Sequence, residues 1–177
     1  MQNRIMDILE RLKKVVDVIE AMIKDGIIDS YALGGATAAN IYIEPFNTID
    51  IDFFIHIVGD VATLDPLRPV IDYLEPKGYL SNGVEFDIEG QLVQFIPFPD
   101  ELTEEATNNA DLLDLGGFSI RALSAEYLVA IMLKIHRPKD LVRAKMFSDQ
   151  QAADVAALEV LIGRYNLEAQ WQRVMQM

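Results

Sequence analysis

Apolar side chains recur every three or four residues near the start of the chain. This spacing is the period of an α-helix with one buried face, and it runs from Ile5 to Ile23 before stopping near Gly26, a residue type that commonly ends helices. The apolar positions are Ile5, Ile8, Leu9, Leu12, Val15, Val16, Ile19 and Ile23. The pattern predicts a long amphipathic helix at this end of the chain.

The middle of the chain alternates between short strand-like and helix-like segments. The strand-like segments are rich in β-branched and aromatic residues, and Glu89-Gly90 and Gly116-Gly117 are typical of hairpin turns. We predict strands at residues 30–33, 49–57, 85–88, 92–97, 112–115 and 118–122. We predict helices at residues 36–42, from Asp65-Pro66 to about Pro76, and at residues 101–110.

A helical pattern returns at Ser124 and continues almost to Met177, with interruptions at Pro138 and at residues 163–166. No repeat, low-complexity linker or Ser/Gly-rich segment divides the chain, and its 177 residues are on the scale of one domain. The sequence therefore predicts one α+β domain over residues 1–177, with a small mixed sheet flanked by helices. We expect the sheet part to end at about residue 123 and a C-terminal helical part to begin at about residue 124.

The most apolar predicted strand carries two aspartates, Asp50 and Asp52. Alternate residues of a strand point to the same side, so the two carboxylates are expected to lie side by side. Among apolar neighbours such a charged pair is costly unless a cation lies between the carboxylates. Mg²⁺ is commonly held by one or two carboxylates together with substrate phosphates. The Gly34-Gly35 turn upstream would allow backbone N–H groups to approach those phosphates.

The composition limits the classes of protein that fit. Hydrophobic residues make up 51% of the chain and charged residues 24%, which is typical of a globular protein, and no apolar run approaches the ~20 residues of a membrane span. A chain without cysteine excludes disulfides, thiol catalysis and thiolate-bound zinc. The first residues lack the apolar core of a secretory signal, so we expect a cytoplasmic protein without a membrane partner.

The net charge of −13 opposes binding to nucleic-acid duplexes, because that binding depends on neutralising phosphates. One segment is basic in spite of the acidic net charge. It carries five cations, at Lys134, Arg137, Lys139, Arg143 and Lys145. Two interpretations of this basic cluster are open. Either it faces a triphosphate or an RNA end, or it is a solvated helix face that pairs with nearby aspartates.

The acid pair and the glycine turn together resemble the signature of the nucleotidyltransferase superfamily, in which a Gly-Gly turn opens a short helix and an Asp-x-Asp strand follows. The matching residues are Leu33-Gly34-Gly35, Thr37 and Thr48-Ile49-Asp50-Ile51-Asp52-Phe53. The alanine-rich helix and the Thr-x-Asp-Ile-Asp-Phe strand are most similar to the AbiEii-like branch, which includes toxin-type transferases. A later lysine-bearing helix with an Arg-x-Lys-Asp segment at 137–140 also resembles that branch. The resemblance covers roughly residues 30–161.

The resemblance implies a protein that binds a metal–nucleoside triphosphate and transfers a nucleoside monophosphate to a hydroxyl of RNA, of a protein or of a small molecule. It implies that Asp50 and Asp52 are the catalytic residues and the ligands of Mg²⁺ or Mn²⁺. It implies nucleotide contacts at Gly34, Gly35, Thr37 and Lys134. A toxin-type member would have an antitoxin protein as a partner. Lys134 also has a structural interpretation, since a lone lysine on an apolar helix commonly extends its amine to solvent.

The chain departs from the family pattern at one position. Active members carry a third acid on a neighbouring strand, which completes the metal site and helps to activate the attacking hydroxyl. The corresponding residue here is Gln94, whose amide oxygen can ligate a cation but cannot act as a general base. Glu85 or Asp87 on the preceding strand is an alternative third acid. Two hypotheses follow, an active transferase and a catalytically degenerate module that binds nucleotide or another protein.

Overall fold

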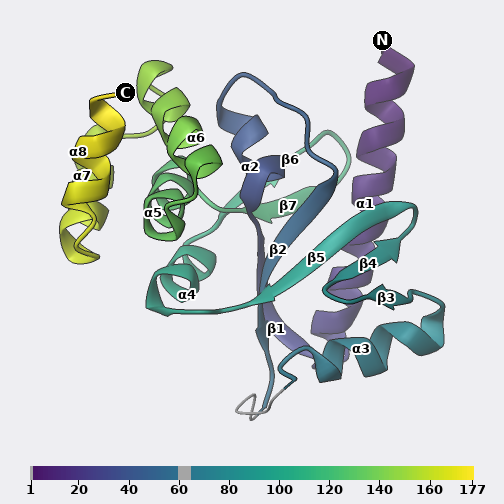
Figure 1. Cartoon of the computed structure of the whole chain (residues 1–177). Coiled ribbons are helices and arrows are strands. Elements are labelled where there is room, and N and C mark those ends of the chain that lie inside the picture. The colour runs from purple at the N-terminus through teal and green to yellow at the C-terminus, as the bar shows by residue number, and fades with distance from the viewer. Residues whose placement is uncertain (1, 60–64) are drawn as a thin grey trace.

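The computed structural model describes the backbone of residues 2–59 and 65–177, and the side chains of these ranges from residue 9 onward (Figure 1). The side chains of Ile5 and Ile8, which the helical pattern includes, lie outside the described residues. The described chain folds into eight α-helices, one short 3-10 helix and one seven-stranded sheet. This arrangement confirms the predicted α+β class with a mixed sheet flanked by helices.

The elements follow one another as the sequence pattern predicts in most places. The helices are α1 (Gln2–Lys24), α2 (Gly35–Tyr42), α3 (Arg68–Leu74), the 3-10 helix η1 (Glu75–Lys77), α4 (Glu101–Asn108), α5 (Ala125–Ile135), α6 (Pro138–Asp149), α7 (Val155–Arg164) and α8 (Glu168–Met175). The strands are β1 (Ile28–Leu33), β2 (Asp50–Ile57), β3 (Ser81–Asn82), β4 (Glu85–Ile88), β5 (Gln91–Pro97), β6 (Asp111–Asp114) and β7 (Ser119–Ala122).

The strand order in the sheet is β3-β4-β5-β2-β1-β7-β6. β2 runs parallel to β5 and β1 runs parallel to β7, whereas the remaining neighbours are antiparallel. The central strand β2 therefore lies between β1 and β5, two strands that are far apart in the sequence. This placement brings residues of β5 beside the aspartates of β2.

One face of the sheet carries the aromatic core. Tyr31, Phe53 and Phe95 lie on adjacent strands, with ring centroids 5.9 Å apart for Tyr31 and Phe53 and 6.4 Å apart for Phe53 and Phe95. The Tyr31 hydroxyl donates a hydrogen bond of 3.0 Å to Glu20 of α1, so α1 covers this face. Because side chains alternate along a strand, the even-numbered residues of β2 point to the opposite face. The aspartates therefore face away from α1.

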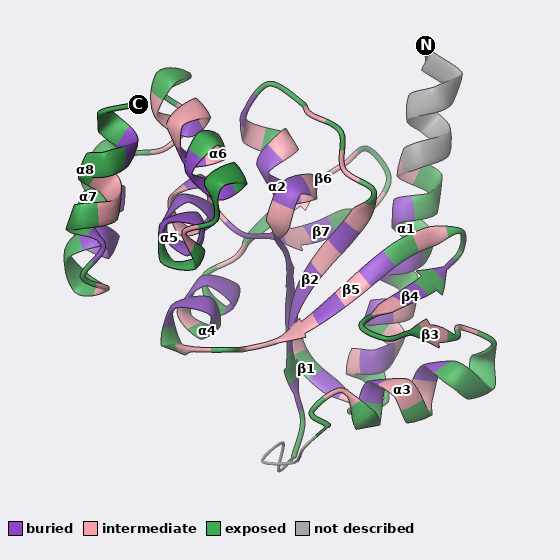
Figure 2. Ribbon diagram, in the orientation of Figure 1, coloured by how far each residue is buried: buried purple, intermediate pink, exposed green. Residues whose placement is uncertain are grey.

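The helical part is organised around α5, which is buried along most of its length (Figure 2). It contacts α2 and α4 of the sheet part on one side and α6, α7 and α8 on the other. The continuous apolar run of α5 follows from this position, since a helix surrounded by protein has no solvated face to fill with polar residues. Within the described residues, no helix is long and apolar enough to cross a membrane.

One predicted helix start is wrong. α3 begins at Arg68, whose N–H donates to the Asp65 carbonyl at 3.2 Å, so Asp65-Pro66 forms a turn before the helix. The predicted end near Pro76 agrees with the structure, because η1 continues the helical run to Lys77 and is capped by Gly78 with φ +92°. A further break between α6 and α7 was not predicted. There the Asp154 side chain accepts a hydrogen bond of 2.8 Å from Ala157 N and starts α7, as an N-cap does.

Candidate functional site

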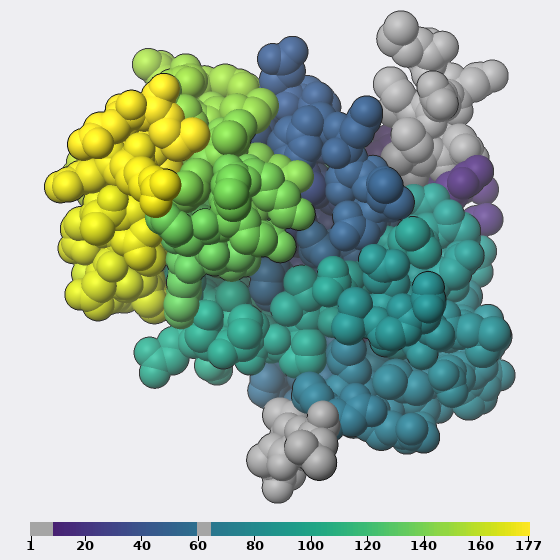
Figure 3. Space-filling model, in the orientation of Figure 1, coloured from purple at the N-terminus to yellow at the C-terminus, as the bar shows by residue number. Residues whose placement is uncertain are grey.

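A cavity of about 220 Å³ lies between the even-numbered face of β2 and the helices α5 and α6. Figure 3 shows the surface hollowed where the green residues of the helical part meet the blue and teal residues of the sheet part. One wall is apolar and consists of Phe54, Ile96, Leu128, Ile131, Met132 and Ile135. The remaining lining is almost entirely charged or polar. The cavity therefore has one apolar wall, and most of its remaining lining residues are charged or polar.

Asp50 and Asp52 lie together on the floor of this cavity. The Thr48 hydroxyl donates to Asp50 Oδ1 at 3.0 Å, which orients that carboxylate. The Thr37 hydroxyl donates to the Asp50 backbone carbonyl at 3.1 Å and so ties the start of α2 to the start of β2. Thr37 therefore supports the aspartate strand, and it is not among the residues that line the cavity.

Burial raises the pKa of Asp52 to about 6, and the neighbouring charge of Asp50 contributes to this rise, against the lowering effect of Arg137, Lys139 and Arg143. The folded-state pKa thus lies above that of an unfolded aspartate, so the native state binds the proton more tightly. The stabilisation from this group is present at low pH and is lost as the pH rises to about 6 and above. At neutral pH the carboxylate pair destabilises the fold, and a cation between the two groups would relieve this cost.

The glycine turn is shaped by its contact with Asp52. Gly34 N donates to the Asp52 backbone carbonyl at 2.8 Å, and a Cβ at Gly34 would overlap the Phe54 ring. Gly35 has φ +56°, and a Cβ there would overlap Asp52 Oδ2. Gly34 is buried, whereas Gly35 lines the cavity. The turn therefore needs glycine to let the Asp52 carboxylate approach the backbone, whether or not a phosphate also binds there.

Gly35→Ala is expected to destabilise the protein by about 2–4 kcal/mol, because left-handed strain and overpacking against Asp52 act together. The matched control is Gly83→Ala, since Gly83 has φ +76° but open space within 4 Å of the position that a Cβ would take. The control isolates the backbone strain of about 1–2 kcal/mol. Urea unfolding of both variants measures the difference. Equal destabilisation would show that Asp52 moves aside freely and that the turn does not position it.

The wall opposite the aspartates is cationic and comes from the start of α6. Arg137, Lys139 and Arg143 line the cavity together with Asp140, which is only 2% exposed. Arg137 donates to Asp140 from Nε at 2.6 Å and from Nη2 at 3.2 Å, a bidentate contact that orients the guanidinium. Arg143 lies 4.0 Å from Asp140 and 4.5 Å above the Phe46 ring. Three cations thus face two carboxylates across one cavity.

The structure does not bring Lys134 to this cavity. Lys134 Nζ forms an ion pair of 2.9 Å with Asp100, the residue that caps α4. It shares α5 with the lining residues Ile131 and Ile135 but points toward α4. The cations that line the cavity belong instead to α6, in the Arg-x-Lys-Asp segment and one turn beyond it. Arg143 lies outside the Arg-x-Lys-Asp motif but belongs to the basic cluster, and its helical spacing from Asp140 accounts for its place beside the motif.

Gln94 occupies the position where a third acid was expected. It is paired with Asp52 in the parallel register of β2 and β5, and it lines the cavity. Glu85 is paired with Gln94 in the antiparallel register of β4 and β5, so it shares the cavity side of the sheet one strand further out. Asp87 has the same orientation, but its Oδ1 accepts from Gly90 N at 2.9 Å and closes the hairpin turn. Asp87 is in register with Asp50 through Leu92, as Glu85 is with Asp52 through Gln94, so Glu85 is the one of the two alternative acids whose carboxylate does not close the turn.

The carboxylate pair suits a hard divalent cation, which prefers oxygen ligands. Within residues 2–59 and 65–177, however, no group of three or more His, Cys, Asp or Glu side chains is arranged to hold a metal by itself. A cation at this site would thus depend on Asp50, Asp52, the neutral Gln94 amide and oxygens from a substrate. The donor set fits the substrate-assisted Mg²⁺ sites in which protein carboxylates supply one or two ligands.

This mixed sheet with its flanking helices is a nucleotidyltransferase-like fold. The solution structure of the antibiotic-resistance factor ANT(2'')-Ia aligns with a TM-score of 0.51 at 13% sequence identity, over 95% of this chain and 97% of that chain. The crystal structure of ANT(2'')-Ia in complex with adenylyl-2''-tobramycin aligns with a TM-score of 0.51 at 16% identity, over 89% of this chain and 97% of that chain.

An antigenic nucleotidyltransferase-like protein from Paracoccidioides brasiliensis aligns with a TM-score of 0.52 at 18% identity, over 92% of this chain and 93% of that chain. No protein-family model matches this sequence, and no curated protein matches it. At these identities the likeness concerns the fold alone. It shows a nucleotidyltransferase-like fold and does not confirm the AbiEii-like branch.

Proposed function

We propose that this protein binds a metal–nucleoside triphosphate and transfers a nucleoside monophosphate to a hydroxyl acceptor. The acceptor oxygen would form a bond to the α-phosphorus and lose its proton to a base, while the bond to the β-phosphate breaks and pyrophosphate leaves. One observation carries the proposal, the cavity in which Asp50 and Asp52 face Arg137, Lys139 and Arg143. A triphosphate is an anion that needs both a hard cation and protein cations around it, and this arrangement supplies positions for both. Such a substrate fits a cytoplasmic location.

The residues of the cavity have separate roles in this proposal. Asp50 and Asp52 would hold Mg²⁺ or Mn²⁺, which when bound neutralises charge on the phosphates and polarises them for attack. The Thr48 hydroxyl holds the Asp50 carboxylate in place, and the absence of a side chain at Gly35 leaves room for Asp52. The α6 cations neutralise phosphate oxygens, and Asp140 fixes the guanidinium plane of Arg137.

The acceptor and the source of the general base are the less defined parts of the reaction. Gln94 cannot accept a proton, so an active enzyme would use Glu85 from the neighbouring strand or an acceptor hydroxyl that is already acidic. The acceptor is RNA, a protein or a small molecule, and ANT(2'')-Ia, which was crystallised with an adenylylated antibiotic, is a precedent for the last of these. The Arg-x-Lys-Asp segment in the cavity supports a place in the AbiEii-like branch, with an antitoxin as partner.

A second function has a specific observation in its favour. Gln94 stands beside Asp52 at the position of the missing acid, so the cavity retains the groups for binding a metal–nucleotide but lacks the expected base. The protein would then be a nucleotide-binding module without efficient turnover. The two functions share the binding step and differ only in transfer.

The binding step is tested with a matched pair of lysine variants. Lys139 lines the cavity and Lys134 does not, so Lys139→Gln is expected to weaken binding of Mg²⁺–ATP about tenfold, and Lys134→Gln is expected to leave it within about twofold. Isothermal titration calorimetry at low salt measures both. Failure of the wild type to bind, or a larger loss in Lys134→Gln than in Lys139→Gln, would contradict the assignment of the cavity as the triphosphate site.

A further inference from the structure

A second and larger pocket, of about 470 Å³, lies on the other side of the sheet. It is bounded by α1, by the region of α3 and η1, and by the turn between β4 and β5, with Val18 and Ala21 of α1 as its apolar base. α1 covers the aromatic face of the sheet, whereas Asp52 and Gln94 face the opposite way. The pocket is therefore separate from the cavity described above. Its volume falls within the range of about 300–1,000 Å³ that is usual for small-ligand sites.

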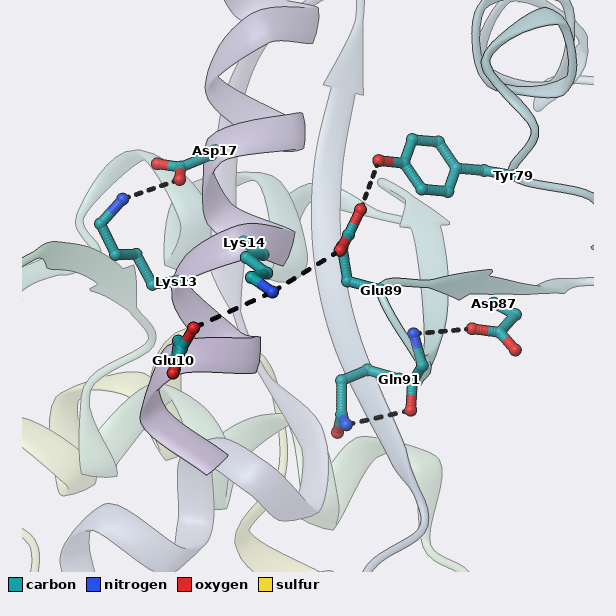
Figure 4. Close-up of polar contacts among 9 residues, drawn as sticks. Glu10, Lys13, Lys14, Asp17, Tyr79, Asp87, Glu89 and Gln91 are labelled. Carbon is teal, nitrogen blue, oxygen red and sulfur yellow. Dashed lines mark hydrogen bonds and ion pairs between the residues drawn. The ribbon is translucent and has the colours of Figure 1, made fainter. Parts of the chain in front are cut away.

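Two tyrosines form the walls of this pocket. Tyr73 donates from its hydroxyl to Asp25 at 2.7 Å. Tyr79 donates from its hydroxyl to Glu89 at 2.9 Å (Figure 4). These bonds hold both side chains at their outer ends. Lys77 lies over the Tyr73 ring, so the Tyr79 ring is the one of the two that is left for contact with a ligand. A half-buried ring beside an aliphatic base is suited to a flat aromatic ligand.

Glu89 has an unusual backbone conformation for a residue with a long side chain. Its φ is +53°, and Gly90 follows with φ +76°, a combination that hairpin turns usually fill with Asn-Gly or Asp-Gly. A glutamate in the left-handed region carries strain of about 1–2 kcal/mol. The turn nevertheless directs its carboxylate to the Tyr79 hydroxyl, and strain of this kind commonly accompanies a site that needs a fixed side chain.

The charged side chains of the pocket differ in how closely they are paired with other groups. Asp17 accepts a salt bridge of 2.7 Å from Lys13, and Glu89 accepts the Tyr79 hydroxyl, so both carboxylates have close donors (Figure 4). Lys14 lies 4.0 Å from Glu10 and 4.0 Å from Glu89, each at the limit of an ion pair (Figure 4). Lys77 Nζ stands 3.5 Å from the centre of the Tyr73 ring, and no described carboxylate lies within ion-pair distance of it.

We propose that this pocket binds a small aromatic anion of the size of a mononucleotide, with its ring system against the Tyr79 ring and its phosphate at Lys14 and Lys77. The proposal rests on charge complementarity, because Lys14 and Lys77 are weakly paired cations in a chain of net charge −13. It does not depend on the proposed transferase function. Lys14 and Lys77 come from different elements, so the phosphate would bridge α1 and η1.

The experiment titrates adenosine 5′-monophosphate into ¹⁵N-labelled protein in metal-free buffer with a chelator, and follows amide shifts by NMR. Saturable shifts are expected at Val18 and Ala21, in the wild type and in Asp50→Asn/Asp52→Asn alike. Adenosine without phosphate is expected to bind about tenfold more weakly, because it lacks the charge-assisted contacts to lysine. Inorganic phosphate alone is expected to shift neither residue, because it offers nothing to the Tyr79 ring.

A matched pair of lysine variants and one tyrosine variant separate a specific site from non-specific binding. Lys77→Gln is expected to weaken binding about tenfold, whereas Lys24→Gln, the same change on an exposed α1 lysine that does not line the pocket, is expected to leave it unchanged. Tyr79→Leu is expected to lose about tenfold through lost stacking, with thermal melting used to verify folding. Absence of saturable shifts at Val18 and Ala21 up to millimolar nucleotide, or equal losses in Lys77→Gln and Lys24→Gln, would overturn the proposal.

Discussion

Gln94→Asp is expected to raise nucleotide transfer by about 10²–10⁴-fold, the range that a positioned general base contributes. Gln94 is the register partner of Asp52 and lines the same cavity, so an aspartate there would place a third carboxylate beside the pair. It would add both a charged ligand for the metal and a proton acceptor for the attacking hydroxyl. Transfer of label from an α-labelled nucleoside triphosphate to total RNA, protein and small-molecule acceptors measures the effect.

The control for this gain is Gln94→Asn, which has the same shape as the aspartate variant but no charge. It is expected to show no increase over the wild type. A contrary result would be efficient transfer by the wild type that persists in Gln94→Ala. Glu85 would then be the acid that completes the site, and Glu85→Gln would be expected to remove the activity.

Asp50→Asn/Asp52→Asn is expected to weaken binding of Mg²⁺–nucleotide by at least about a hundredfold, since even outer-shell partners of a metal contribute 10–100-fold. The same variant is expected to be more stable than the wild type in metal-free buffer at pH 7.5. The reason is that the pKa of Asp52, raised to about 6 by burial and by Asp50, makes its ionised form unfavourable at that pH. The gain is expected to be about 1–3 kcal/mol and to disappear toward pH 4, where the wild-type Asp52 carboxyl group is protonated.

Asp87→Asn is the matched control for the aspartate pair. It carries the same substitution on the cavity side of the sheet, and its amide oxygen can still accept from Gly90 N. Calorimetry should show nucleotide binding unchanged in this control. A double variant that is more stable and still binds Mg²⁺–nucleotide as tightly as the wild type would show that Asp50 and Asp52 form a structural pair and hold no metal.

Local pattern was sufficient for most of the fold. The alternation of apolar residues around Asp50 and Asp52 predicts a strand with both acids on one side, and the structure has this strand at the centre of the sheet. Helix boundaries were less predictable where local backbone turns and capping groups decide them. The break before α7 combines the left-handed backbone of Gln151 with a hydrogen bond from Ala157 N to the Asp154 side chain, and the hydrophobic period carries no information about either.

The sequence by itself determined the α+β class, the acid pair, and the absence of an acid at Gln94, because these depend on residue types and on spacing within one strand. Only the tertiary structure decided which cations face the acids. Lys134 and Lys139 are five residues apart, yet one pairs with Asp100 and the other lines the cavity, because the chain turns at His136 in a left-handed conformation between α5 and α6. The direction of a side chain after such a turn follows from how the two helices pack, which spacing along the chain does not specify.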